Sequence, residues 1–111
     1  KLKTARRLFT KKIITSLPDV IITSNDLIAQ GIISAAHENG INIPNDMQIT
    51  GFDDLISSAY FIPSVTTVSQ NIDELAKRCF SMLMDLINKK SAVSSIIEQN
   101  IISRSSAKIN I

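Results

Sequence analysis

Two short segments of the chain that are predicted to be strands are each followed by a polar side chain that could bind a ligand. Asn25 comes after the run Val20–Thr23, and Asp53 comes after the run Met47–Phe52. Ligands of open α/β sheets bind beyond the carboxyl ends of the strands, and adjacent parallel strands would bring these side chains together. A carboxamide and a carboxylate offer donors and acceptors to a polyol. The alternative interpretation is structural, with Asn25 only capping a helix and Asp53 only starting a turn.

The other reactive side chains do not form a catalytic or metal-binding pattern. Asp53 and Asp54 are adjacent carboxylates, but no base or nucleophile is matched to them nearby. His37 has no Cys or His at metal-ligand spacing, which favours a surface histidine. Cys79 falls on the apolar stripe of a helix, where we expect a buried and inert thiol. The sequence therefore predicts a protein that is not an enzyme and uses no metal or cofactor.

The two runs are predicted to be strands that a helix connects. The first run is β-branched and continuously apolar, as in a strand buried on both faces. Asn25 and Asp26 then favour a helix start, Leu27–Asn39 has helical periodicity, and Gly40 is a typical stop. In the second run, Gly51 would let the backbone come close to another group. A strand–helix–strand unit of this kind is a right-handed crossover, and we expect an α/β fold with a parallel sheet and flanking helices.

Further elements flank this unit. Apolar periodicity and turn residues predict a helix over Leu2–Ser16 ended by Pro18, a short helical or irregular stretch over Leu55–Phe61, and strands over Val65–Val68 and Ile96–Ile102. The clearest helix follows Asn71, which is predicted to cap it with Glu74 as the capping-box partner. Its apolar stripe extends to Ile87.

Composition and charge narrow the class of protein. The chain has 111 residues, of which 44% are hydrophobic and 20% charged, as expected for one small globular domain. No apolar run approaches the roughly 20 residues of a membrane helix, and no signal-peptide pattern is present. A single cysteine excludes an internal disulfide and fits a reducing, cytoplasmic compartment.

Half of the basic residues lie near the start of the sequence. They are Lys1, Lys3, Arg6, Arg7, Lys11 and Lys12. Such a helix could contact phosphates, but no aromatic side chains are interleaved to stack on bases. A solvated helix face is the favoured interpretation.

Several segments occur in an order that is typical of one protein family. Pro18–Leu55 reads PDVIITSNDLIAQGIISAAHENGINIPNDMQITGFDDL, and Tyr60–Gln70 reads YFIPSVTTVSQ. The helix from Ile72 and the strand Ile96–Ile102 follow, so that the similarity covers Pro18 to about Ser106. Together these segments resemble the LacI/GalR family of transcription regulators.

The resemblance implies a fold and a set of binding residues. Members have a two-subdomain, type I periplasmic-binding-protein-like domain, a three-layer α/β/α fold, which follows an N-terminal helix-turn-helix domain. The resemblance implies that Asn25 and Asp53 face the cleft and bind a small-molecule effector, a sugar or sugar derivative. Gln70 matches a position beside the cleft, at a hinge crossing. Operator DNA would be bound only through the helix-turn-helix domain, which this chain lacks.

The resemblance also implies a homodimer. The candidate interface residues are Ile28, Gln30, Ile33, Tyr60 and Phe61. The alternative is that the isoleucines belong to the core and the aromatic side chains close the sheet edge, because a sheet needs the apolar face of its covering helix first.

The resemblance further divides the chain. We expect a C-terminal fragment of the effector-binding domain, with about 1–70 in the C-terminal subdomain. Residues 71–98 would form a helix and strand that pack on the N-terminal subdomain, and 99–111 a return strand and tail. The apolar stripe of the helix would then lose part of its cover, and we expect pairing with another copy. The alternative function is a fragment of a periplasmic sugar-binding transport protein, against which the YFIPSVTTVSQ segment favours the regulator.

Overall fold

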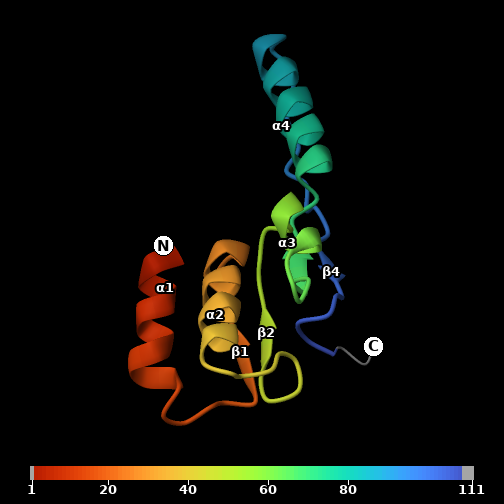
Figure 1. Cartoon of the computed structure of the whole chain (residues 1–111). Coiled ribbons are helices and arrows are strands. Elements are labelled where there is room, and N and C mark those ends of the chain that lie inside the picture. Colours follow the sequence, from red (N-terminus) through yellow and green to blue (C-terminus); the bar gives the residue numbers. More distant parts are fainter. Residues whose placement is uncertain (1, 109–111) are drawn as a thin grey trace.

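The chain forms a small sheet covered by helices on one face, with one long helix projecting from it (Figure 1). A computed structural model describes residues 2–108, with principal extents of 59 × 30 × 22 Å. No helix within this range is long and apolar enough to cross a membrane.

The first helix of the chain packs against the helix that covers the sheet. α1 (Leu2–Leu8) continues into a π-helical turn, η1 (Phe9–Ile13), so the predicted helix over Leu2–Ser16 is helical up to residue 13. Phe9 is fully buried against the core, whereas the lysines of this segment are exposed. Arg6 Nη2 donates to both carboxylate oxygens of Glu38 at 2.7 Å, which joins α1 to the end of α2. The exposed basic side chains agree with a solvated helix face.

The predicted strand–helix–strand unit is confirmed. β1 (Val20–Ile22) and β2 (Gln48–Thr50) are parallel, in a register that pairs Ile22 with Thr50. α2 (Asp26–Glu38) connects them. Gly40 follows α2 with a φ of 72°, the left-handed conformation expected of a helix stop. Small buried side chains on α2, among them Ala29, Ala35 and Ala36, let the helix lie close to the sheet.

The rest of the sheet is built from short segments. α3 (Ile56–Tyr60) leads to β3 (Thr67–Ser69), which pairs antiparallel with β4 (Asn100–Ile102). A single parallel bridge between Thr50 and Thr66 connects this pair to β2. The segment after β4 also enters the sheet: Ser106 is fully buried, and its Oγ donates to the carbonyl of Ile49 at 2.6 Å.

The long helix α4 (Ile72–Ile87) has the predicted bounds but not the predicted cap. Asn71 has a left-handed φ of 53° and makes no side-chain cap hydrogen bond. A cap residue normally has an extended backbone, which Asn71 lacks. Glu74 accepts a hydrogen bond from Arg78, one turn further along α4. The predicted capping box is therefore wrong.

Two further predictions about this part of the chain are wrong. Cys79 is exposed rather than buried, because α4 has no buried residue. The strand predicted over Ile96–Ile102 begins only at Asn100. Ile96 is 97% exposed, and within residues 2–108 no strand lies beside it to provide ladder hydrogen bonds.

The glycine that ends β2 is required by close packing. A Cβ built on Gly51 would lie 2.0 Å from Oδ1 of Asp26, whose side chain is fully buried. The close approach expected of Gly51 is therefore confirmed, and the group that approaches is a carboxylate.

We predict that Gly51→Ala lowers the free energy of unfolding by about 3 kcal/mol, because the added methyl must displace a buried, hydrogen-bonded carboxylate. Gly40→Ala is the matched control: its φ of 72° is unfavourable, but no atom lies within 4 Å of the added Cβ. The Gly40→Ala substitution should lower the free energy of unfolding by about 1–2 kcal/mol. Urea unfolding followed by circular dichroism measures both, and equal losses would contradict the packing argument.

Candidate functional site

The predicted ligand-binding residues lie where the two parallel strands end. Asn25 and Asp53 each come three residues after a register pair, Ile22 and Thr50. The backbone N–H of Asp26 donates to the carbonyl of Phe52 at 2.9 Å, so the two strand ends are hydrogen-bonded to each other. The geometry thus places both residues at one edge of the sheet, as the order of the elements predicted.

Asn25 has a structural role at this edge. It is the N-cap of α2, and its Oδ1 accepts a hydrogen bond from the backbone N–H of Ile28 at 3.0 Å. The prediction that Asn25 caps the helix is therefore confirmed, and the cap uses its side-chain oxygen. The cap does not use the amide nitrogen, which is a donor that a ligand could use.

Asp53 is held in an unfavourable backbone conformation. Its φ is 105°, and that of Asp54 is 52°, a region that L residues rarely adopt. The N–H of Asp53 donates to the carbonyl of Val68 at 3.0 Å. Asp54 Oδ1 accepts from Nη2 of Arg104 at 2.6 Å, in a mostly buried ion pair. Backbone strain that neighbouring contacts maintain is common at binding sites.

Gln70 lies beside Asp53. Its Nε2 donates to Oδ1 of Asp53 at 2.7 Å, and both side chains are half-buried. The structure thus joins two of the three predicted effector-binding residues directly. Oδ2 of Asp53 and Oε1 of Gln70 are acceptors beyond this hydrogen bond, which suits a ligand that carries hydroxyl groups.

A hollow of about 530 Å3 opens next to Asp53. The loop 53–56, Ser69 and the first residues of α4, 71–73, line it. Its volume is in the range of small-molecule sites. Asn25 and Gln70 are not among the lining residues, so Asp53 is the one of the three that lines the hollow.

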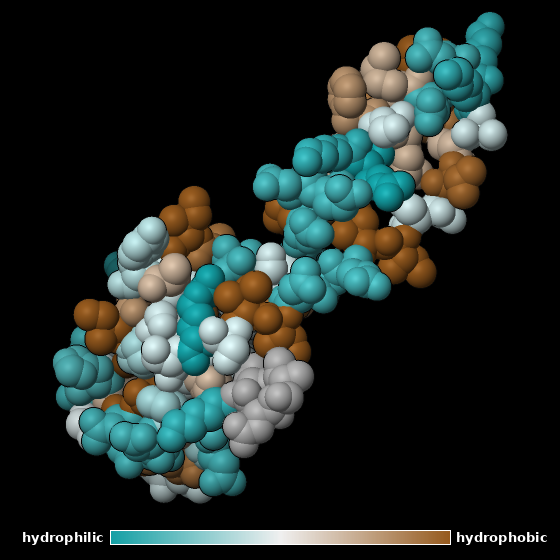
Figure 2. Space-filling model, turned by 90° about the vertical axis from the view of Figure 1, so that its right-hand side faces the viewer, coloured by the Kyte–Doolittle hydropathy of each residue, from teal (hydrophilic) through white to brown (hydrophobic). Residues whose placement is uncertain are grey.

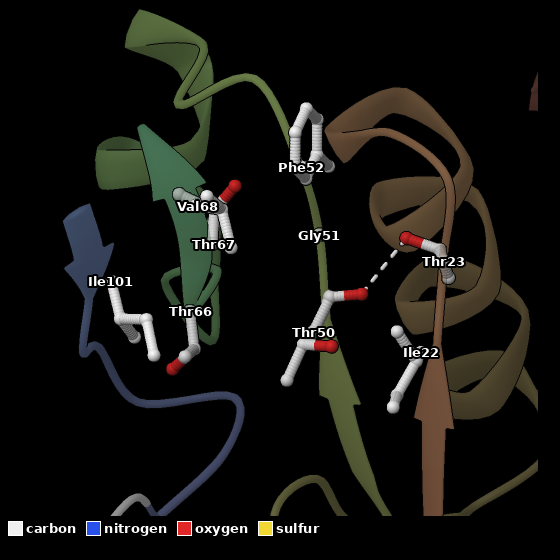
Figure 3. Close-up of a pocket in the computed structure, with 9 residues that line it drawn as sticks. All are labelled: Ile22, Thr23, Thr50, Gly51, Phe52, Thr66, Thr67, Val68 and Ile101. Carbon is white, nitrogen blue, oxygen red and sulfur yellow. Dashed lines mark hydrogen bonds between the residues drawn. The ribbon is translucent and has the colours of Figure 1, made fainter. Parts of the chain in front are cut away.

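A second hollow, of about 190 Å3, is apolar and lies on the bare face of the sheet (Figure 3). Side chains of Ile22, Thr50 and Ile101 extend into it, and the Oγ1 of Thr23 donates to the carbonyl of Thr50 at 2.8 Å. Ile22 is 82% exposed here. The hollow has few polar groups and is less suited to a polyol than the hollow beside Asp53.

Asp26 organises the site, although sequence reasoning assigned it only to the start of a helix. Its carboxylate is fully buried and accepts three hydrogen bonds, from the N–H of Leu55 at 2.8 Å and from two hydroxyl groups. Ser58 Oγ and Thr67 Oγ1 each donate to it at 2.6 Å. One side chain therefore ties α2 to the loop after Asp53 and to β3. The signal in the sequence was Gly51, whose missing side chain makes room for this group.

The residues predicted for a dimer interface separate into two groups. Gln30 and Ile33 are 6% and 1% exposed, so they have little surface to offer another chain. Ile33 belongs to the core, and Gln30 Nε2 donates to Ser57 and Ser58 at 2.9 and 3.1 Å. Ile33 thus lies where the alternative interpretation expected the isoleucines, in the core, and the hydrogen bonds of Gln30 join α2 to α3.

The other predicted interface residues are more accessible. Ile28 and Phe61 are partly buried against the core, whereas Tyr60 is 82% exposed. Ile56 and Ile62, which sequence reasoning did not include, are 83% and 90% exposed beside Tyr60. His37 is exposed, as expected, and residues 2–108 contain no cluster of His, Cys, Asp or Glu that could hold a metal.

Comparison with known proteins shows which protein family this chain is similar to. Residues 2–107 match the periplasmic binding protein-like domain. The HTH-type transcriptional repressor PurR of Pasteurella multocida is 35% identical over 85 residues, which are 77% of this chain and 25% of that protein. The HTH-type transcriptional regulator RegA of Clostridium acetobutylicum is 36% identical over 92 residues, 81% of this chain and 28% of the relative. The chain thus spans about a quarter of the length of these relatives.

Two similar solved structures are also those of transcription regulators. The periplasmic binding ribose operon repressor protein from Lactobacillus acidophilus has a TM-score of 0.87 and 31% identity, covering 97% of this chain and 40% of that one. A LacI-type transcription regulator from Bifidobacterium animalis has a TM-score of 0.81 and 27% identity, covering 97% and 38%.

We predict that Asp26→Asn lowers the free energy of unfolding by about 2 kcal/mol, because a carboxamide cannot accept all three buried hydrogen bonds. Asp46→Asn is the control, since the exposed Asp46 side chain accepts one hydrogen bond, from the N–H of Asn42. The free energy of unfolding of this control variant should fall by less than about 1 kcal/mol. Chemical denaturation of both variants checks this, and a similar loss for the two would mean that the buried network does not matter.

Proposed function

The chain belongs to the periplasmic-binding-protein-like domain family, as part of an effector-binding domain of the LacI/GalR type, and we propose that it binds a sugar or sugar derivative for a transcription regulator. In this proposal residues 1–70 belong to the C-terminal subdomain, 71–98 pack on the N-terminal subdomain, and 99–111 are the return strand and tail. The observation that supports effector binding best is the strained, hydrogen-bonded Asp53 beside a hollow of about 530 Å3.

Each proposed ligand group has a distinct part. Asp53 accepts hydrogen bonds from ligand hydroxyl groups, and Gln70 fixes the orientation of its carboxylate through the 2.7 Å hydrogen bond. Asn25 donates from the amide nitrogen that its capping role leaves available. Because the backbone at residues 53 and 54 is already ordered, little conformational entropy is lost there when the ligand binds.

The regulatory mechanism that we propose is a population shift. An effector that contacts both subdomains favours the closed arrangement by its differential affinity for the two states. In a dimer, this shift changes how the DNA-binding domains are placed relative to each other, which couples the effector to operator DNA. The named relatives are transcription regulators, which supports a cytoplasmic regulator over a transport protein and over an enzyme.

The proposed dimer surface is centred on Tyr60. Ile56 and Ile62 add exposed apolar area beside it, and Phe61 anchors the segment against the core. An aromatic side chain among exposed aliphatic ones is typical of a protein interface. Gln30 supports this surface from beneath through its hydrogen bonds to Ser57 and Ser58.

We predict that D-ribose, or another member of a panel of pentoses, hexoses and their phosphates, shifts the amide NMR signals of Asp53 and Gln70. Asp53→Ala should weaken this binding at least tenfold, because a charge-assisted hydrogen bond is lost. Asp19→Ala is the control: it removes the same charge from an exposed side chain just before β1, at the opposite edge of the sheet. If the folded chain shows no shift with the panel, or if Asp53→Ala binds as well as the parent, the site is misassigned.

A further inference from the structure

Arg104 lies two residues after β4, in a segment that the sheet holds firmly. This segment is on the right of Figure 1 and therefore on the side that Figure 2 presents, where hydrophilic and apolar side chains are intermixed. The N–H of Arg104 donates to Oγ1 of Thr66 at 2.9 Å, and the N–H of Ile49 donates to the carbonyl of Ser106 at 2.9 Å. The guanidinium group thus extends from a backbone that is fixed by other contacts.

The guanidinium group joins two further parts of the chain. Its Nη1 donates to the carbonyl of Val65 at 2.9 Å, and its Nη2 donates to Oδ1 of Asp54 at 2.6 Å. The side chains of Arg104 and Asp54 are only 18% and 25% exposed, so salt screens this ion pair less than one at the surface. Because the guanidinium group is planar and rigid, the contact with Val65 also fixes the direction of the contact with Asp54.

The loop that Arg104 contacts has an unfavourable backbone. Asp53 and Asp54 have φ angles of 105° and 52°, two consecutive values that residues with a side chain rarely adopt. The N–H groups of Asp53 and Leu55 are hydrogen-bonded on the two sides of Asp54. The N–H of Asp54 itself lies 3.4 Å from Oγ1 of Thr67, which is a long hydrogen bond. The ion pair with Arg104 is therefore the main support of residue 54.

We propose that Arg104 is a positioning residue of the effector site, which acts on Asp53 through Asp54. Gln70 holds the carboxylate of Asp53 directly, at 2.7 Å, and Arg104 holds the residue that follows it. Without Arg104, Asp54 would carry an uncompensated charge beside the hollow that both aspartates line. The loop would then relax and turn the carboxylate of Asp53 away from Gln70. This inference rests on the proposed function, because it assigns Arg104 to the presentation of Asp53 to a ligand.

The positions of Gln70 and Arg104 in the chain fit this role. Gln70 follows β3 and Arg104 follows β4, and the two strands are paired, with Ser69 opposite Asn100. Between them lies the part, 71–98, that the proposed function packs on the N-terminal subdomain. Each of the two strands that connect this part to the sheet therefore supplies one contact to the loop 53–54.

The test measures the affinity for D-ribose, or for the panel member that binds the parent most tightly, by isothermal titration calorimetry. Arg104→Ala should weaken binding about fivefold or more. Asp54→Asn keeps the size of its side chain and gives a second variant where Arg104→Ala does not fold; it should weaken binding about threefold, because a neutral acceptor binds a guanidinium group less strongly. Arg6→Ala is the matched control, which removes a 2.7 Å ion pair with Glu38 at the far end of α2. Its affinity should stay within about twofold of the parent.

A double variant shows whether Arg104 acts through Asp54. If it does, Arg104→Ala should add less than about twofold to the effect of Asp54→Ala, because the contact is already lost. Arg104→Lys keeps the charge but not the planar fork, so its affinity should lie between those of Arg104→Ala and the parent. Independent, multiplying effects of Arg104→Ala and Asp54→Ala would overturn the proposal.

The side-chain NH2 signals of Gln70 in NMR spectra give a readout that needs no ligand. They report the hydrogen bond to Asp53, which a general loss of stability in a folded chain would not change. Arg104→Ala should shift them toward their positions in the Asp53→Ala chain, whereas Arg6→Ala should leave them in place. Unchanged Gln70 signals in the folded Arg104→Ala chain would overturn the proposal, whatever its affinity.

Failure of this inference is distinguishable from failure of the proposed function. If no sugar of the panel binds the parent, the proposed function is wrong, and the Gln70 signals alone then decide whether Arg104 positions Asp53. If the parent binds a sugar and Arg104→Ala binds it equally well, the site is correct and the role of Arg104 is wrong.

Discussion

The buried carboxylate of Asp26 is the interaction on which the rest of this structure depends. Burying a carboxylate is costly unless hydrogen bonds replace its water, and here three donors do so from two separate segments. Within residues 2–108, no buried side-chain polar atom lacks a partner. The start of α2, the loop after β2 and β3 must therefore take up their positions together. Gly51 is part of the same constraint, because any side chain there would occupy the place of the carboxylate.

The candidate site is a consequence of this arrangement. The loop that Asp26 holds at Leu55 begins with Asp53, and the strand that it holds at Thr67 ends just before Gln70. The hydrogen bond between Gln70 and Asp53 thus closes a ring of contacts that starts at Asp26. The ion pair between Arg104 and Asp54 adds the segment after β4 to the ring. Hydrogen bonds that hold a candidate site in this way would reduce the entropic cost of binding there.

The apolar surfaces of the chain are unevenly covered. α2 shields one face of the sheet and α1 packs against α2, and Ile49, Ile33 and Phe9 are almost fully buried there. On the other face Ile22 remains 82% exposed, and the large apolar side chains of α4 are exposed as well. Apolar surface of this extent favours association, since each side chain removed from water contributes roughly 25 cal/mol per Å2. The distribution fits a chain that spans about a quarter of the length of its relatives.

Local pattern determined much of the fold. The β-branched run before α2, the helix cap and Gly40 predicted β1, α2 and β2 as a parallel unit, and the position of Asn25 and Asp53 after two strands predicted that they share an edge. The assignment of Gln70 to the site rested only on the family resemblance. Local pattern could not decide burial, because burial depends on what packs against a face. The periodicity of α4 is the same whether or not its apolar stripe is covered, so Cys79 was predicted to be buried. Gln30 and Ile33 lie on a helix that either a partner or the same chain could cover, and in the fold the core covers Ile33 while α3 contacts Gln30. Only the tertiary structure showed that Asp26, a residue typical of any helix start, is the buried acceptor that joins three segments distant in sequence.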